Sequence, residues 1–439
     1  MHGELHMDGF AIPPDARSAG LSQAAERWGR LAYGAALAFV ANLYASPAFY
    51  WPEIFEPLRL GVVTSAVCAF AVIMRRITSG ERLRLGGLPV ALLLAYLLMH
   101  PLSFTWTISL PRTVEAVVDM GKMLVVYVAL LNALDTPGRL RAALMVGALA
   151  TLAPSLGGIE RWLNDDRLID GYRTAWRGNY ADPNRLAMGL VLFLPAALLL
   201  VPGAKRPWLK ALLLLSAAAS VTAIILTHSR SGTIAMAAAV GLALLRGRAK
   251  GRGLVLAGAA LMAVVALAPQ SFWMRQSSIA SYEEDASFAG RERAYAMLRV
   301  IFDERPLTGV GAGGFLDAWT RYAPLSAGGQ RLIAHNIFME ILGELGLLAF
   351  LLFAAFCAWL LWRLWQAGAS HVGVEARAVF AGLVGYLVCE LVNGYSRSFN
   401  LYTAFALAVA VVAHTRRREQ LLAEAGGGQD QNRLRVGGW

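Results

Sequence analysis

Apolar residues recur along this chain in long runs that are separated by shorter polar connectors. With a window of about 19 residues, twelve runs qualify as candidate membrane helices: 31–50, 58–74, 86–105, 116–134, 141–157, 185–203, 208–227, 231–246, 253–269, 336–362, 377–395 and 400–414. An α-helix needs about 20 mainly apolar residues to cross the hydrocarbon core of a bilayer. The pattern therefore predicts an all-α, polytopic integral membrane protein with about twelve transmembrane helices.

The overall composition agrees with this prediction. Hydrophobic residues make up 57% of the 439 residues, charged residues make up 16%, and the mean hydropathy is +0.51. Soluble globular domains carry about 25% charged residues. The composition therefore excludes an ordinary soluble domain.

Lysine and arginine gather in every second connector. The clusters are Arg27 and Arg30; Arg75, Arg76, Arg82 and Arg84; Arg139 and Arg141; Lys205, Arg206 and Lys210; Arg246, Arg248, Lys250 and Arg252; Arg363 and Arg377; and Arg416, Arg417 and Arg418. Because Lys and Arg accumulate in short cytoplasmic loops, these connectors and both termini are predicted to be cytoplasmic. The same rule accounts for most of the formal charge of +11, so no nucleic-acid partner is predicted.

The connectors define the expected organisation of the chain. Residues 1–30 form a cytoplasmic segment without the apolar core of a cleavable signal peptide, so the first helix is expected to direct insertion. Residues 31–415 form the transmembrane domain, with long outer loops at 158–184 and 270–335. The second loop is predicted to contain extramembrane helices. Residues 416–439 are predicted to be a cytoplasmic C-terminal tail, and its polar, glycine-rich part, "EAGGGQDQNRLRVGGW", is predicted to be disordered.

The second outer loop begins with a helical pattern. In "RERAYAMLRVIFDERP", Tyr295, Leu298, Ile301 and Phe302 are expected on one face, and Pro306 is expected to end the helix. Such spacing is typical of an amphipathic helix on a membrane surface.

A glycine motif, "GVGAGG", follows this helix and places Gly309, Gly311 and Gly314 in a GxGxxG pattern. That pattern indicates dinucleotide binding only between a strand and a helix of a βαβ unit. Because no such unit is predicted here, the motif is interpreted as a tight turn.

Residues that could hold a metal ion or hydrolyse ATP are not grouped in the sequence. Cys68, Cys357 and Cys389 lie in separate predicted helices and are interpreted as packing residues, and neither a P-loop lysine motif nor HExxH occurs. We expect no metal ion or other cofactor. Asp119 and Lys122 are three residues apart on one helix and are expected to neutralise each other.

Three outer segments carry cationic or imidazole side chains that the positive-inside rule does not explain. Arg230 lies in the very short hairpin "THSRSG", where it either extends to the headgroups or forms a fixed cation for phosphate. Arg291 and Arg293 by themselves fit a solvated helix face. His335 by itself fits a hydrogen-bonded structural histidine.

Four motifs together indicate a family. The segments "GNYADPNRLAMGL", "LTHSRSGTIAM", "GRERAYAMLRVIFDERPLTGVGAGGF" and "HNIFMEILGELGLLAF" resemble, in order and approximate spacing, the O-antigen ligase and polymerase superfamily of bacterial envelope proteins. The resemblance covers about residues 172–350. It implies a GT-C-like membrane glycosyltransferase that takes a glycan from undecaprenyl pyrophosphate on the periplasmic face of the bacterial inner membrane.

The resemblance places the family's important arginines on Arg230 and Arg291, rather than Arg293, and its histidine on His335. Together with the chemistry of the residues nearby, it predicts the following roles. The predicted catalytic residues are His335, Arg230 and Arg291; the predicted substrate-binding residues are Arg177, Asp182, Asn184, Arg293 and Asn336; and the predicted supporting residues are Ser229, Glu340 and Glu344. The chemistry of these side chains agrees with the predicted roles, because guanidinium groups can stabilise the negative charge that develops on a leaving pyrophosphate. A neutral imidazole can take the proton of the acceptor hydroxyl or orient that hydroxyl. The expected reaction inverts the anomeric centre without a metal ion.

The identity of the acceptor depends on the outer loops. A single compact loop of about 65 residues favours an O-antigen ligase, which uses the lipid A-core oligosaccharide as acceptor. A polymerase or a protein O-oligosaccharyltransferase of the same superfamily remains an alternative. From another class, a lipid-linked sugar flippase remains open, although internal repeats typical of transporters are not found and the polar residues gather at the outer face. The other expected partners are membrane lipids, and a monomer is favoured.

Overall fold

The structure is a computed structural model that describes residues 16–245, 268–277, 286–323 and 331–436. Within these ranges all regular elements are helical, and β-pairing is limited to one isolated bridge between Ile169 and Arg173. The all-α prediction is confirmed for this part of the chain. The predicted helix at 253–269 and the basic connector at 246–252 lie essentially outside the described residues.

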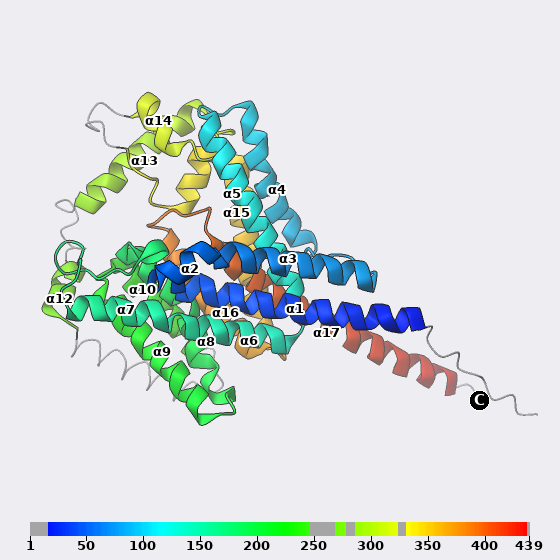
Figure 1. The fold of residues 1–439 in the computed structure, drawn as a ribbon. Helices are drawn as coiled ribbons and strands as arrows, with labels where there is room; N and C mark the ends of the chain where they lie inside the picture. The colour runs from blue at the N-terminus through cyan, green and yellow to red at the C-terminus, as the bar shows by residue number, and fades with distance from the viewer. Residues whose placement is uncertain (1–15, 246–267, 278–285, 324–330, 437–439) are drawn as a thin grey trace, which may run out of the picture.

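The helices follow each other with short connections (Figure 1). The first part of the chain forms α1 (Ala16–Ala45), η1 (Pro47–Phe49), α2 (Pro52–Leu58), α3 (Leu60–Ser79), α4 (Leu88–Leu102), η2 (Ser103–Thr105), α5 (Leu110–Ala133), α6 (Pro137–Ala150), α7 (Leu152–Leu163), η3 (Gly178–Tyr180) and α8 (Pro183–Leu199). The second part forms η4 (Val201–Gly203), α9 (Pro207–Leu226), α10 (Arg230–Leu245), α12 (Gln270–Ser277), α13 (Ala286–Glu304), α14 (Phe315–Tyr322), α15 (Ile337–Ala367), α16 (Gly373–Glu390) and α17 (Phe399–Val436).

Several of these helices can cross a membrane. Four described segments are long and apolar enough by themselves: Pro52–Ser79, Pro137–Leu163, Pro207–Leu226 and Ile337–Ala367. Shorter apolar helices cover Val90–Thr105, Pro183–Leu199 and Arg230–Leu245. The chain is thus a multi-pass membrane protein, whereas the count of twelve spans stays a prediction.

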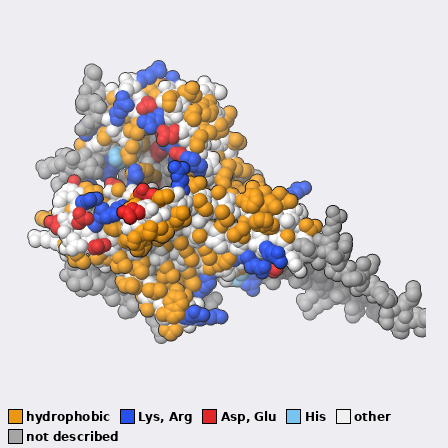
Figure 2. Space-filling view, viewed as in Figure 1, with side chains coloured by type: hydrophobic (Ala, Val, Ile, Leu, Met, Phe, Trp, Pro, Cys, Tyr) orange, Lys and Arg blue, Asp and Glu red, His pale blue; other side chains and the backbone are white. Residues whose placement is uncertain are grey.

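Large apolar side chains face outward on the flank of the bundle. Val62 and Ile77 on α3 are 65% and 68% exposed, and Leu98 on α4 is 60% exposed. Figure 2 shows a broad apolar surface of this kind on the side of the molecule that faces the viewer. Contact of such a large apolar surface with water is unfavourable, so this surface is suited to lipid acyl chains.

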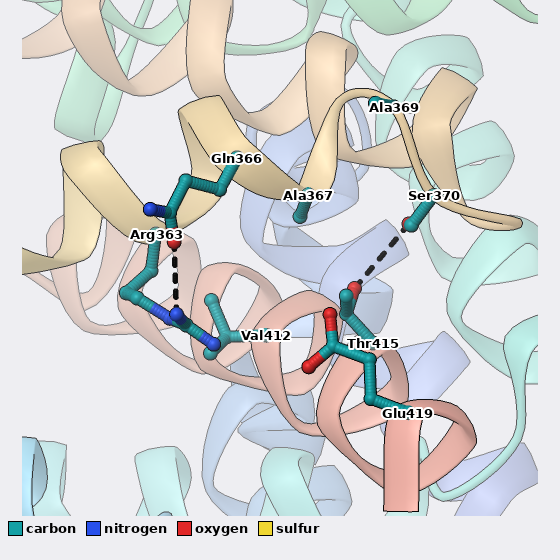
Figure 3. A pocket seen from close by; sticks show the side chains of 8 residues that line it. All are labelled: Arg363, Gln366, Ala367, Ala369, Ser370, Val412, Thr415 and Glu419. Atoms are coloured by element: carbon teal, nitrogen blue, oxygen red, sulfur yellow. Dashed lines mark hydrogen bonds between the residues drawn. The ribbon is translucent and has the colours of Figure 1, made fainter. Parts of the chain in front are cut away.

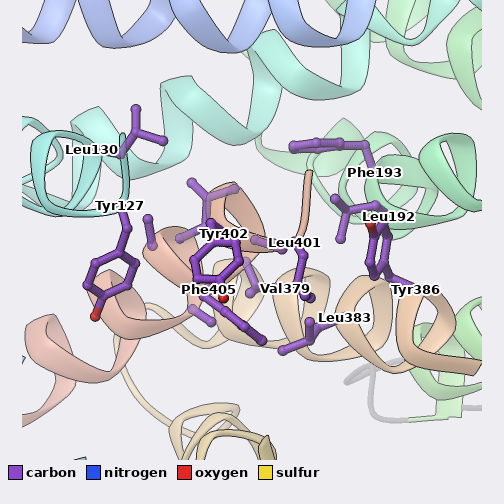
Figure 4. Close-up of a cluster of buried hydrophobic side chains, with 14 of the residues drawn as sticks. Tyr127, Leu130, Leu192, Phe193, Val379, Leu383, Tyr386, Leu401, Tyr402 and Phe405 are labelled. Carbon is purple, nitrogen blue, oxygen red and sulfur yellow. The ribbon is translucent and has the colours of Figure 1, made fainter. Parts of the chain in front are cut away.

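The core of the bundle is built from tightly packed helices. α1 lies along α3, and α16 packs on both α8 and α10. A Cβ atom at Gly382 would meet the carbonyl oxygen of Leu192, so glycine is what allows α16 to approach α8 closely. Figure 4 shows aromatic side chains from four helices in this core, including Tyr127, Tyr386 and Tyr402.

Two smaller predictions about packing and pairing can be compared with the structure. Cys68, Cys357 and Cys389 are free and buried, as expected for packing residues. Lys122 Nζ lies 2.8 Å from Asp119 Oδ1, which confirms the predicted ion pair.

The basic connectors meet at one end of the bundle. Asp135, after α5, pairs with Arg75 of α3 at 2.6 Å and with Arg139 of α6 at 2.9 Å. Arg141 of α6 pairs with Glu375 of α16 at 2.8 Å. Connectors that were predicted to share one membrane side therefore contact one another.

The outer loop has a core of its own. Ala294, Met297, Leu298 and Ile301 of α13 are buried against α14 and α15, whereas Tyr295 is 37% exposed. The predicted apolar face was therefore wrong at Tyr295, because α13 packs on protein and its buried stripe is rotated toward Ala294 and Met297. As predicted, the helix ends just before Pro306.

The glycine motif forms the predicted tight turn. Gly309, Gly311 and Gly313 have φ values of 61°, 98° and 73°, a region that glycine adopts at little cost. A Cβ atom at Gly309 would meet backbone atoms of Gly343 and Glu344 in α15. The turn therefore lies directly against α15.

α15 is broken at the point where this turn docks. Gly346 has φ 80° and ψ −177°, which is not helical. The turn supplies replacement hydrogen bonds: Val310 N donates to the Gly343 carbonyl at 2.9 Å, and Gly311 N donates to the Glu344 carbonyl at 2.8 Å. Leu347 N donates in turn to the Pro306 carbonyl at 2.8 Å. This break was not predicted from the sequence.

The C-terminal segment differs from the prediction. α17 continues without interruption to Val436, although "EAGGGQDQNRLRVGGW" was expected to be disordered. The residues that lead into this stretch, "REQLLAEA", are strong helix formers. Residues 437–439 lie outside the described part of the chain.

Candidate functional site

The first part of the candidate site is the start of α8. The Asp182 side chain accepts hydrogen bonds from Asn184 N at 2.8 Å and from Arg185 N at 3.1 Å, and Pro183 is the first helical residue. This is the N-cap arrangement expected of Asp-Pro-Asn. It fixes the orientation of Asp182 and Asn184 relative to the helix.

The start of α10 lies beside the start of α8. Only three residues, 227–229, separate α9 from α10, as predicted for the Arg230 hairpin. Ser229 Oγ donates to Asn184 Oδ1 at 2.8 Å and accepts from Gly232 N at 3.1 Å. Arg230 follows Ser229 directly and is the first residue of α10. Ser229 and Asn184 therefore hold the two helix starts together.

The third helix start belongs to α15. The Asn336 side chain caps this helix by accepting from Phe338 N at 2.9 Å and from Met339 N at 3.3 Å. His335, just before the cap, has a left-handed φ of 52°. Gly394 packs closely against the backbone of both residues. A strained histidine backbone that its surroundings enforce is a feature typical of functional sites.

Charged residues of two other segments, Arg291 and Asp182, act on the pKa of His335. His335 is half-buried, and burial followed by the positive charge of Arg291 lowers its pKa below the ordinary value of 6.5. The carboxylate of Asp182 acts in the opposite direction. Since burial and Arg291 prevail, the imidazole is neutral at pH 7 and able to accept a proton.

Two other predicted arginines have local partners. Arg293 Nε donates to the Ala289 carbonyl of its own helix at 3.3 Å. Arg177 is exposed, donates to the Phe49 carbonyl at 2.8 Å and lies over the Trp176 ring at 5.4 Å. Among the described contacts, these two residues meet none of the other predicted site residues. Hydrogen bonds join Asp182, Asn184 and Ser229, and the charges of Asp182 and Arg291 act on His335.

A residue that sequence reasoning missed, Arg397, organises the two carboxylates of α15. Its Nη1 lies 2.5 Å from Glu344 Oε2, and its Nη2 lies 3.5 Å from Glu340 Oε1. Ser396 donates to Glu340 through both its hydroxyl, at 2.8 Å, and its backbone N, at 3.2 Å. Gly313 N donates to Glu344 Oε2 at 2.8 Å. The first turns of α15 are thereby tied to the α16–α17 connection and to the glycine turn.

The guanidinium of Arg397 stays protonated. Burial would lower the pKa of its guanidinium, but Glu344 and Glu340 outweigh this effect and raise the pKa above the ordinary value. The signal for this residue was present in the sequence. Like Arg230, Arg397 lies in a short connection predicted to be on the outer side, where the positive-inside rule does not explain an arginine.

A cavity of ≈ 180 Å³ lies next to the start of α15. It is lined by Gly313, Phe315, Leu316, Ile333, Ala334, Glu340, Glu344, Gly394, Tyr395 and Arg397. The Arg185 guanidinium lies over the Tyr395 ring, 3.9 Å from the ring centroid. This contact connects the wall of the cavity to α8. Figure 2 shows the molecular surface hollowed between the part formed by α13 and α14 and the part formed by α7 and α10, with charged side chains along the hollow.

The site lies at the end of α8, α10 and α15 that is opposite to the basic connectors. These helices start at Pro183, Arg230 and Ile337 and run away from the site; in the sequence α8 is followed by Lys205 and Arg206, α10 is followed by Arg246 and Arg248, and α15 carries Arg363 near its own end. The fold and the site together define a multi-pass membrane protein with an arginine- and histidine-containing site at one end of its helices.

The comparison with protein families gives one match. Residues 211–354, about a third of the chain, match the family model described as O-antigen ligase. This match supports an O-antigen ligase/polymerase-type glycosyltransferase. The matched residues include Arg230, Arg291 and His335. No curated protein matches the chain.

Proposed function

We propose that this protein is an O-antigen ligase that transfers a glycan from undecaprenyl pyrophosphate to the lipid A-core oligosaccharide on the periplasmic face of the inner membrane. The observation that carries the proposal is the position of His335. This half-buried imidazole is kept neutral by burial and by Arg291, and it lies beside the starts of α8 and α15. A neutral base next to a fixed cation is what glycosyl transfer from a pyrophosphate requires.

The reaction first requires stabilisation of the leaving pyrophosphate. As the anomeric bond breaks, negative charge develops on the pyrophosphate, and Arg230 and Arg291 stabilise it more in the transition state than in the ground state. The N-termini of α8, α10 and α15 add partial positive charge on the same side. In this proposal the arginines supply the positive charge for phosphate that a divalent cation supplies in other enzymes.

The reaction also requires activation and binding of the acceptor hydroxyl. His335 takes the proton of the attacking hydroxyl, and attack from the side opposite the pyrophosphate inverts the anomeric centre. The cavity beside the start of α15 offers an aromatic ring, a guanidinium and carboxylates. Sugar hydroxyl groups can bind to such groups as donors and acceptors.

The experiment that tests this proposal uses the full-length protein in nanodiscs. The donor is an undecaprenyl pyrophosphate-linked glycan, the acceptor is lipid A-core, and EDTA is present without nucleotide. We expect ligated product with the wild type and a rate loss of at least 100-fold for His335→Ala, Arg230→Ala and Arg291→Ala. Arg299→Ala is the control, because Arg299 is an exposed arginine of the same helix, α13, as Arg291.

The alternatives give different outcomes in the same system. Extension of a second lipid-linked glycan, without transfer to lipid A-core, would instead make the protein a polymerase, and transfer to a protein hydroxyl would make it a protein O-oligosaccharyltransferase. Movement of the donor across the bilayer without any new glycosidic bond would indicate a flippase. The broken α15 resembles a transporter feature, but here the break is filled by the backbone of residues 306–311.

A further inference from the structure

A second polar cavity lies at the other end of the bundle, between the end of α15 and α17. Its volume is ≈ 230 Å³, and it is lined by Arg363, Gln366, Ala367, Ala369, Ser370, Val412, Thr415 and Glu419. This end of the molecule carries the basic connectors and is predicted to be cytoplasmic. The cavity is far along α15 from His335, and the proposed transfer reaction does not use it.

Opposite charges face each other across this cavity. Figure 3 shows Arg363 of α15 and Glu419 of α17 directed toward the space between the two helices. Among the described side chains the two do not form an ion pair, and Arg363 Nη1 donates to Gln366 Oε1 at 2.8 Å. Arg363 Nε is buried and has no hydrogen-bond partner in the described part of the chain. A cation and an anion thus line one cavity without neutralising each other.

Hydroxyl groups lie on the remaining wall. Ser370 Oγ and Thr415 Oγ1 are 3.4 Å apart and span the gap between the α15–α16 connection and α17. Both groups can donate and accept hydrogen bonds. A ligand in the cavity therefore meets donors on the α15 side, an acceptor at Glu419 and adaptable hydroxyls between them.

The neighbouring side chains place the cavity at headgroup level. Leu348 and Leu351 on α15 are both 52% exposed and face the lipid, and farther along the same helix Trp362 and Trp365 are 55% and 47% exposed. Exposed tryptophans at the end of an apolar span mark the membrane–water interface. Because Arg363 is next to Trp362, the cavity lies where phospholipid headgroups are found.

We propose that this cavity binds the headgroup of a phosphatidylethanolamine-type lipid. The phosphodiester accepts hydrogen bonds from Arg363, and the primary ammonium donates to Glu419 and to the hydroxyl groups. A phosphatidylcholine headgroup has the same two charges, but its quaternary ammonium has no N–H to donate. A phosphatidylglycerol headgroup has the anion without the cation and leaves Glu419 unneutralised.

The test measures lipid binding to the delipidated full-length protein in detergent by native mass spectrometry, with matched acyl chains on all lipids. We expect the wild type to bind phosphatidylethanolamine about tenfold more tightly than phosphatidylcholine or phosphatidylglycerol, because only phosphatidylethanolamine can donate charge-assisted hydrogen bonds from its ammonium to Glu419. Both Arg363→Gln and Glu419→Gln are expected to abolish this preference. Arg417→Gln, which changes a neighbouring arginine of α17 outside the lining, is expected to keep it.

Several results would overturn the assignment. Equal binding of the three lipids by the wild type, or strongest binding of phosphatidylglycerol, would show a general basic surface. A preference that survives either lining substitution, or that disappears in Arg417→Gln, would show that Arg363 and Glu419 do not select the headgroup. Competition by free phosphoethanolamine at the same concentration as the lipid would contradict a membrane-lipid site. Thermal unfolding without lipid verifies that each variant is folded.

Discussion

His335 is the residue to which the proposed function assigns the role of the base. Burial and the positive charge of Arg291 lower the pKa of its imidazole from 6.5, and the negative charge of Asp182 raises that pKa. A general base works above its own pKa, so activity is lost as the pH falls through that value. We expect the acidic limb of the transfer rate to lie below pH 6.5, as measured by the initial ligation rate over a pH series.

Substitution of the two neighbouring charges should move this limb in opposite directions. Arg291→Gln removes a positive charge, raises the pKa of His335 and moves the limb to higher pH. Asp182→Asn removes a negative charge, lowers that pKa and moves the limb to lower pH, while asparagine still caps α8. Identical limbs in both variants would mean that His335 does not set the pH dependence.

Arg397 is expected to act on stability and position together. Its removal in Arg397→Gln leaves Glu344 and Glu340 in a buried environment without their cation. Breaking a buried ion pair from one side costs about 3–5 kcal/mol. We expect a large loss of thermal stability in detergent and a lower ligation rate, and Glu344→Gln in the same chain should restore part of the stability. An unchanged melting temperature for Arg397→Gln would refute this role.

The residue scale also shows where prediction from sequence succeeds. Asp182-Pro183-Asn184 was recognised as a helix start because capping is local chemistry within a few residues. The sequence marks Arg397 only as an arginine in a connection predicted to be outer; its partners Glu340 and Glu344 lie more than fifty residues earlier in the chain, so its pairing could not be predicted. Local patterns reveal caps and turns, whereas an ion-pair network between distant segments requires the fold.

At the scale of elements, α15 is the clearest departure from the sequence pattern. Its apolar run predicted one continuous helix, yet Gly346 interrupts it and the glycine turn of residues 309–313 docks at the break. Hydropathy does not detect the break, because a glycine inside an apolar run has the same hydropathy whether or not it is helical. The direction of the α13 face was misjudged for a related reason, since its packing partners, α14 and α15, are defined only by the tertiary fold.

Glycine substitutions at this break should be costly. In Gly346→Ala the new Cβ would meet the backbone of Leu307 at a left-handed φ of 80°. We expect a loss of about 1–3 kcal/mol or more in stability, measured by thermal unfolding in detergent. The matched control is Gly241→Ala in α10, where a Cβ atom meets no atom within 4 Å, and alanine there should be neutral or stabilising. Equal effects at both positions would contradict the role of the break.

At the scale of the whole molecule, the sequence pattern correctly indicated an all-helical, multi-pass protein and the grouping of basic connectors. Arg75 and Arg139 meet at Asp135, although they belong to different connectors. The direction in which the bundle sits in the membrane remains a prediction, because ion pairs between connectors do not depend on which side they face.

Cysteine labelling tests this orientation. The native cysteines are buried, so a single introduced cysteine dominates the signal. Thr105 is exposed at the predicted outer end of the span 86–105, and Arg206 is exposed in a connection predicted to be inner. We expect a membrane-impermeant maleimide to label Thr105→Cys in intact spheroplasts and Arg206→Cys only after permeabilisation. The reverse pattern would place the candidate site on the cytoplasmic side and exclude a periplasmic ligase.

The docking of the glycine turn also bears on how the protein is assembled. Within a bilayer, backbone groups that are left without partners cost several kcal/mol each, and the break in α15 would expose such groups if residues 306–311 were elsewhere. This turn precedes α15 in the chain and lies outside the apolar runs. The outer loop is therefore a structural part of the membrane bundle, and defects in it will first appear as poor insertion and low abundance of the protein, before any effect on glycan transfer is seen.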